Sequence, residues 1–206
     1  MRSFLAAVAT LSMAMMGEVM ATPSYAPSGV QFSVSESTVT SGGWSVCYSA
    51  TYATPLGNSA GTALGECAGP DIMYAAMATG SSTFDLLAWA PLADVTFNTG
   101  AANNGVTHVA NGTEWYYADN YSVGFAGLGE AVLKNQCDEN AGADRLCWHT
   151  VNGAGGYRDG NITGLNASSD YTKVILTDSV PVPEPISLVL LASGLVGVRL
   201  LRQRRA

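Results

Sequence analysis

The sequence predicts a mainly β protein, built as a single antiparallel β-sandwich or jelly-roll-like domain. Short runs rich in β-branched and aromatic residues recur along the chain, and turn-forming pairs such as Asn-Gly, Gly-Gly and Asp-Gly separate them. No stretch of a dozen residues combines a 3.6-residue apolar period with helix caps. No internal repeat stands out, which argues against solenoids and propellers.

The expected strands follow one another at short intervals. Each is a run of β-branched or aromatic residues bounded by Gly, Asn, Asp or Ser. They are Val30–Val39, Trp44–Tyr52, Phe84–Trp89, Val95–Asn98, Glu114–Tyr117, Tyr121–Phe125, Arg145–Val151 and Tyr171–Leu176. Around Asp71–Thr79 and Gly129–Asn135 the sequence also permits a helix.

The C-terminus has three parts. A linker at 178–185 ends in the motif Val182-Pro183-Glu184-Pro185, which we expect to be extended because proline fixes φ and disfavours the α region in the residue before it. An uncharged apolar run extends from Ile186 to Val198. The arginines that follow are Arg199, Arg202, Arg204 and Arg205.

The apolar run predicts a short transmembrane helix within residues 186–206. As a helix, residues 186–201 span roughly 24 Å, less than a hydrocarbon core of about 30 Å. Snorkelling of Arg199 and local thinning can make up the difference. The terminal arginines favour a cytoplasmic C-terminus. A buried core helix is the alternative, but the segment lacks a polar face.

In this order the three parts resemble the PEP-CTERM sorting signal of Gram-negative bacteria that make extracellular polysaccharide. The resemblance covers about 25 residues: Pro183-Glu184-Pro185, the apolar run and the terminal arginines. It implies recognition by an exosortase, a membrane cysteine protease-transpeptidase, and cleavage near the Pro-Glu-Pro. The membrane would then hold the protein only before processing, and the product would reach the cell surface or extracellular matrix. Arg199 departs from the pattern because it falls inside the hydrophobic stretch.

Residues 1–21 have the three parts of a secretory signal peptide. A positive N-terminal end precedes the apolar segment Phe4–Met16, and Val19-Met20-Ala21 fits cleavage after Ala21. Ser24-Tyr25-Ala26 offers a second cleavage pattern, and an uncleaved anchor is the alternative. We therefore expect the general secretion machinery and signal peptidase as partners, and residues 22–177 as the exported β-rich domain.

Charge limits the partners of the exported part. Residues 22–180 carry four basic and fourteen acidic residues, a net charge of −10, whereas the whole chain has −7. Nucleic acid is not an expected partner because phosphate recognition needs clustered Lys and Arg. The acidity favours solubility and could also collect divalent cations.

Four cysteines predict disulfides, because exported proteins fold in oxidising compartments. Of three pairings, proximity favours Cys47–Cys67 and Cys137–Cys147, which close loops of about 20 and 10 residues and stabilise by roughly 3 kcal/mol each. A zinc site is the alternative, but the sequence has no Cys-x-x-Cys pair and His149 is a lone nearby histidine.

One segment, residues 112–127, has the composition of a sugar-binding site. Aromatic faces stack on the C–H groups of sugars while neighbouring amides and carboxylates bind hydroxyls. The alternative is that these rings fill the sandwich core. The candidate rings are Trp115, Tyr116, Tyr117 and Tyr121.

A second segment offers oxygen ligands within the loop that the Cys137–Cys147 pairing would close. Calcium takes six to eight oxygens, so this loop is a candidate calcium site. It lacks the EF-hand order, and a solvated acidic turn is the simpler interpretation. No other cofactor is predicted. The candidate ligands are Asp138, Glu139, Asn140 and Asp144.

No catalytic motif is present: neither Gly-x-Ser-x-Gly, nor His-Glu-x-x-His, nor a phosphate-binding loop. We therefore expect a noncatalytic cell-surface or matrix protein that binds exopolysaccharide. A secreted carbohydrate-active enzyme is one alternative, with Glu114 and either Asp119 or Glu130 as the first carboxylate pair to inspect. A purely structural surface subunit is the other.

Overall fold

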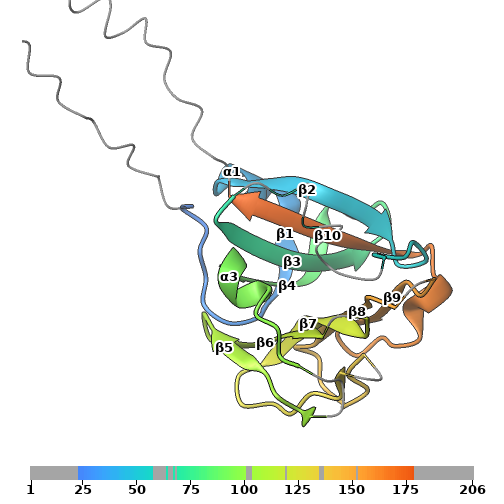
Figure 1. Cartoon of the computed structure of the whole chain (residues 1–206). Helices are drawn as coiled ribbons and strands as arrows, with labels where there is room; N and C mark the ends of the chain where they lie inside the picture. Colours follow the sequence, from blue (N-terminus) through green and yellow to red (C-terminus); the bar gives the residue numbers. More distant parts are fainter. Residues whose placement is uncertain are drawn as a thin grey trace, which may run out of the picture.

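The computed structural model describes residues 23–178, except 58–63, 65, 66, 68, 101–103, 119, 135, 136 and 152. Two antiparallel five-stranded sheets stack on each other, which confirms the mainly β, two-sheet architecture (Figure 1). The predicted signal peptide, proline motif and transmembrane helix lie outside the described residues, so their boundaries stay predictions. Among the residues described, no helix has the length and hydropathy needed to cross a bilayer.

The first sheet has the strand order β1-β4-β3-β10-β2. Its strands are β1 (Gln31–Ser35), β4 (Thr83–Pro91), β3 (Asp71–Ala78), β10 (Tyr171–Asp178) and β2 (Trp44–Thr51). The helix α1 (Glu36–Ser41) follows β1 directly. The Ser35 hydroxyl accepts a hydrogen bond from the Thr38 N–H at 3.2 Å and caps this helix, so the strand expected over Val30–Val39 is only half as long.

The second sheet is a meander of consecutive strands. They are β5 (His108–Ala110), β6 (Thr113–Ala118), β7 (Ser122–Gly127), β8 (Leu146–His149) and β9 (Gly156–Asp159). A jelly roll builds its two sheets from two Greek keys. A sheet of consecutive strands does not have that connectivity, so the jelly-roll alternative is wrong. Asn111 and Gly112 connect β5 to β6 with φ values of 46° and 73°, as expected for an Asn-Gly hairpin turn.

The segment around Asp71–Thr79, for which the sequence permitted a helix, forms the central strand β3 instead. Alternate residues such as Tyr74 pack between the sheets, while Met73 and its neighbours on the other face pack in a second apolar cluster. A strand covered on both faces has a continuous apolar run without alternation, so its sequence resembles that of a buried helix. The strand expected over Val95–Asn98 is also wrong, because Val95 ends the short helix α3 (Leu92–Val95).

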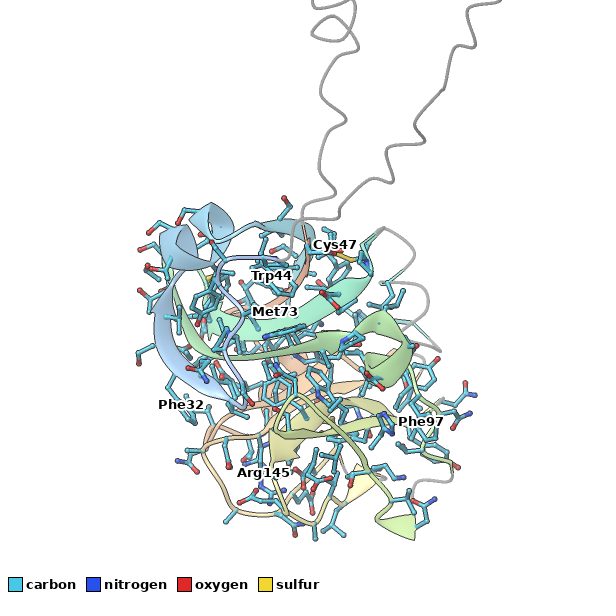
Figure 2. The ribbon with its side chains drawn as sticks, turned by 90° about the vertical axis from the view of Figure 1, so that its left-hand side faces the viewer. Phe32, Trp44, Cys47, Met73, Phe97 and Arg145 are labelled. Carbon is cyan, nitrogen blue, oxygen red and sulfur yellow. A yellow bond between two sulfur atoms is a disulfide. The ribbon has the colours of Figure 1, made fainter. Side chains whose placement is uncertain are left out.

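Residues 23–30 form a strap that covers the outer face of the first sheet together with α1. The indole N–H of Trp44 donates a hydrogen bond to the carbonyl of Tyr25 at 2.7 Å, and that of Trp89 donates to the carbonyl of Pro27 at 2.7 Å. Trp44 and Met73 lie together in the upper part of Figure 2. The strap therefore seals the second apolar cluster from solvent.

Both ends of the described chain meet at the start of β2. Pro23 lies against Gly43, since a Cβ at Gly43 would approach the Pro23 Cα to 3.3 Å. Asp178 pairs in register with Trp44. The segments that precede Pro23 and follow Asp178 therefore join the domain at one end (Figure 1).

The cysteine pairing that proximity favoured is confirmed. Cys47 is bonded to Cys67 and Cys137 to Cys147, with Cα separations of 5.2 and 5.5 Å. The first bond, visible beside the Cys47 label in Figure 2, ties β2 to the segment that precedes β3. The second ties the long β7–β8 connection to β8, so each disulfide closes a loop onto a strand.

Candidate functional site

The predicted sugar-binding rings divide into buried and exposed members. Trp115 and Tyr116 are 1% and 0% exposed, and the Trp115 ring packs edge-on against Tyr74 at 5.6 Å in the core between the sheets. A buried ring has no free face for a sugar. The sugar-binding prediction is therefore wrong for these two residues, whose rings fill the core instead. Tyr117 is half-buried, and Tyr121, at 46% exposed, lies at the turn between β6 and β7.

The predicted calcium loop is held by an arginine. The Asp138 carboxylate is fully buried and accepts a hydrogen bond from Arg145 at 2.6 Å. The Asn140 amide donates to a backbone carbonyl, Glu139 is exposed, and the Asp144 carboxylate lies against β7. A cation at Asp138 would have to displace the guanidinium. Across the described residues, no group of three or more His, Cys, Asp or Glu is arranged around a metal position.

All four basic residues of the described domain are buried, each at most 4% exposed. They bond mainly to backbone carbonyls and fix loops. The Arg158 guanidinium alone donates to the carbonyls of Asp138, Asn140, Gly142 and Gly160. The surface of the described domain therefore presents acidic side chains without lysine or arginine. The buried residues are Lys134, Arg145, Arg158 and Lys173.

The acidic pair first considered for glycoside hydrolysis holds loops. The Glu114 carboxylate accepts hydrogen bonds from the Thr107 hydroxyl at 2.6 Å and the Gly129 N–H at 2.9 Å. Glu130 forms an ion pair with Arg145. Asp119 lies outside the described residues. Both described carboxylates are thus engaged by neighbouring groups of the fold.

A different acidic pair, Asp85 and Asp159, borders a cavity where the two sheets meet. Asp85 lies in β4 of the first sheet and Asp159 ends β9 of the second. The cavity has a volume of about 330 Å³, and Phe32 and Ile162 supply apolar lining. Phe32 is 50% exposed and lies at the side of the molecule, at the level where the two layers meet (Figure 2).

Burial leaves Asp159 without a hydrogen-bond donor. The residue is 3% exposed, and neither carboxylate oxygen accepts a hydrogen bond from the described residues. Desolvation and, second, the charge of Asp85 raise the pKa of Asp159 to about 8. At neutral pH the Asp159 carboxyl group is therefore mostly protonated.

Two local backbone features shape this cavity. Ser33 has a left-handed φ of 52° within β1, and Phe32 and Ser33 both line the cavity, although neighbours on a regular strand face opposite sides. Asp159 and Ile162 exchange backbone hydrogen bonds of 2.9 and 3.0 Å across a tight turn. In that turn Gly160 has φ 55°, and a Cβ there would approach a backbone carbonyl oxygen to 2.9 Å, so glycine fits best.

Sequence reasoning missed this pair because 74 residues separate Asp85 from Asp159 and neither lies in a motif. The local signal was weak. Asp85 is a charged residue between Phe84 and Leu86 in an otherwise apolar strand. Only the register of the folded sheets brings it beside the turn that follows β9.

The comparisons with known proteins concern the C-terminus alone. No curated protein and no solved structure matches the chain. A family model described as the PEP-CTERM protein-sorting motif matches residues 181–205. This match confirms the resemblance carried by Pro183-Glu184-Pro185, the apolar run and the terminal arginines. The chain therefore carries a C-terminal PEP-CTERM protein-sorting motif, which begins just beyond the end of β10.

Proposed function

We propose that this protein is an exported, exosortase-processed component of the surface or extracellular matrix of a Gram-negative bacterium, and that it is noncatalytic and binds exopolysaccharide. The observation that carries the sorting half is the PEP-CTERM motif at residues 181–205, which implies processing by exosortase. The two disulfides agree with it, because such bonds persist in oxidising compartments outside the cytoplasm.

The fold favours signal-peptide cleavage after Ala21 over cleavage after Ala26. Tyr25 is part of the strap: its carbonyl accepts the Trp44 indole N–H, and its own N–H donates to the Gly42 carbonyl at 3.2 Å. Cleavage after Ala26 would remove Tyr25 and leave the buried Trp44 indole without this acceptor. Cleavage after Ala21 leaves the whole strap in place.

The position of the motif supports processing close to the folded domain. Glu184 lies six positions after Asp178, the end of β10. Even a fully extended chain of that length spans only about 20 Å. The enzyme would therefore act beside the end of the domain where Pro23 and Asp178 both lie.

Three features support a binding role without catalysis. The four cysteines are in disulfides, so none of their thiols is a free nucleophile. Glu114 and Glu130, the described members of the acidic pairs first considered for glycoside hydrolysis, are engaged by neighbouring groups of the fold. Exposed aromatic rings remain for stacking on sugars, and Tyr121 belongs to the segment that the sequence singled out.

The sorting half is tested by Glu184→Gln in the native host, with Glu139→Gln as a matched exposed acid outside the motif. We expect the Glu184 variant, or a chain lacking Arg202–Arg205, to remain in the inner membrane as a larger species, while the Glu139 variant is processed normally. Unchanged release and mass of the Glu184 and truncated variants would reject the sorting claim.

The binding half is tested by co-sedimentation of the exported protein with the polysaccharide of its own host. We expect retention, and weaker retention for Tyr121→Ala. If no polysaccharide retains the protein, with or without calcium, the binding half fails and the sorting half stands alone.

A further inference from the structure

The structure assigns a divalent-cation site to Asp85 and Asp159 in the cavity between the two sheets, and we propose Ca²⁺ as the ion that it takes. Its carboxylates are not those of the acidic loop at 138–144 that the sequence indicated, although Ala143 of that loop also lines the cavity. It also goes beyond the proposed function, because it depends neither on sorting nor on polysaccharide binding.

Asp159 has no partner of opposite charge among the described residues. Its carboxylate is buried and faces the cavity, and neither oxygen has a donor among the described residues. Buried carboxylates in proteins are normally paired with a cation or hydrogen-bonded, since an isolated buried charge is costly. Asp85 adds a second carboxylate beside Asp159. Repulsion between the two negative charges makes the fully ionised pair still less favourable.

The basic residues of the described domain are engaged elsewhere. Arg158 directly precedes Asp159 in the sequence, yet its guanidinium bonds to four backbone carbonyls. Arg145 binds Asp138 and Glu130, and the Lys173 ammonium bonds to the carbonyls of Tyr52 and Thr54. Neutralisation of the pair must therefore come from a proton or from a cation taken from solution.

The chemistry of the cavity lining also suits a cation. Ser33 and Asn161 lie on the lining beside the two carboxylates, and they add a hydroxyl and an amide to an all-oxygen ligand set. A volume of about 330 Å³ holds an ion and several waters, since a water occupies about 30 Å³. Ca²⁺ accepts six to eight oxygens in flexible geometry, whereas Mg²⁺ requires a near-ideal octahedron, so Ca²⁺ suits this open, mixed site better.

Binding would join the two sheets, because Asp85 belongs to the first and Asp159 to the second. An ion that binds the folded state alone stabilises it in proportion to the logarithm of its concentration over Kd. With Ca²⁺ at ten times Kd, we expect the Tm to rise by about 3–6 °C for a domain of this size.

The test is calorimetric titration of CaCl₂ into the full-length chain, purified in mild detergent and freed of metal with a chelator, at pH 8. We expect one Ca²⁺ per chain with Kd in the range of about 10⁻⁵ to 10⁻³ M, from the weak end of sensor sites to extracellular modules. MgCl₂ should bind at least tenfold more weakly. Asp159→Asn and Asp85→Asn should each lower the Ca²⁺ affinity at least tenfold, while Glu139→Gln should leave it unchanged.

The two aspartate variants and the Glu139→Gln control distinguish the possible results of the titration. Asp85 is exposed, so Asp85→Asn keeps the test valid even if Asp159→Asn does not fold. Absence of both heat and a Tm shift at 10 mM CaCl₂ would overturn the proposal. Loss of binding in Glu139→Gln with retention in Asp85→Asn would also overturn it, and would locate the ion in the 138–144 loop.

Discussion

The substitution Asp159→Asn in the metal-free protein should remove most of the pH dependence of stability between pH 5 and 7. Burial, and then the neighbouring charge of Asp85, raise the Asp159 pKa from 3.8 to about 8. The folded state therefore binds a proton that the unfolded state has released. The stabilisation by the neutral acid is fully present below pH 3.8 and is lost as pH rises through about 8.

The slope of this loss can be worked out. One proton of difference changes the free energy of unfolding by about 1.4 kcal/mol per pH unit, so the site contributes a fall of about 3 kcal/mol from pH 5 to pH 7. The other titratable groups facing Asp159 are Asp85, Tyr52 and Tyr171; the two tyrosines have pKa values raised above 10 by desolvation and stay neutral in this window. An Asn at position 159 is neutral at every pH and can donate a hydrogen bond to Asp85.

Urea unfolding followed by tryptophan fluorescence, with a chelator present, measures this difference at pH 5, 6 and 7. Wild-type protein should lose about 1.4 kcal/mol per pH unit relative to Asp159→Asn. The shift that burial causes in His149, whose pKa is lowered, is common to both proteins and cancels in the comparison. Glu139→Gln, which removes an exposed acid, should run parallel to wild type. A constant difference between wild type and Asp159→Asn from pH 5 to 7 would refute the reasoning.

Three further predictions concern the charges and cross-links of the fold. Arg158→Met removes the donor to four buried carbonyls and should lower the free energy of unfolding by about 3–5 kcal/mol in urea; a loss below about 1 kcal/mol would show that these bonds are not needed. Replacing Cys137 and Cys147 together by alanine opens a loop of 10 residues and should lower the free energy of unfolding by about 3 kcal/mol in urea. Equal stability of wild type and the double variant would show that this disulfide does not stabilise the fold. Native trypsin digestion should spare residues 23–178, because Lys134, Arg145, Arg158 and Lys173 are all buried, and early cleavage at any of them, detected by mass spectrometry, would contradict this burial.

The sequence predicted most of the strands in which apolar and polar residues alternate, and most of the apolar runs that lie between turn residues. β2, β4, β6 and β10 all lie close to their expected ranges. The central strand β3 was not predicted, because both of its faces are buried and its run Ile72–Ala78 carries no period of two. Periodicity can locate a half-buried strand, but it cannot distinguish a strand covered on both faces from a buried helix.

The site was harder to predict than the fold. The cysteine pairing followed from spacing, since short loops close most readily. The roles of Trp115 and Asp138 depended on which face of the sheet they meet and which arginine approaches them, and composition contains neither fact. The Asp85–Asp159 contact exists only after the two sheets stack, so no local pattern could indicate it.

The most direct test of the central claim is the intact mass of the mature protein recovered from its native host, with and without reductant. We expect a chain that begins at Thr22, ends at or near Pro183-Glu184-Pro185, and gains four hydrogens on reduction of its two disulfides. A mass showing that the chain still extends to Ala206, in protein that has left the inner membrane, would contradict processing at the PEP-CTERM motif.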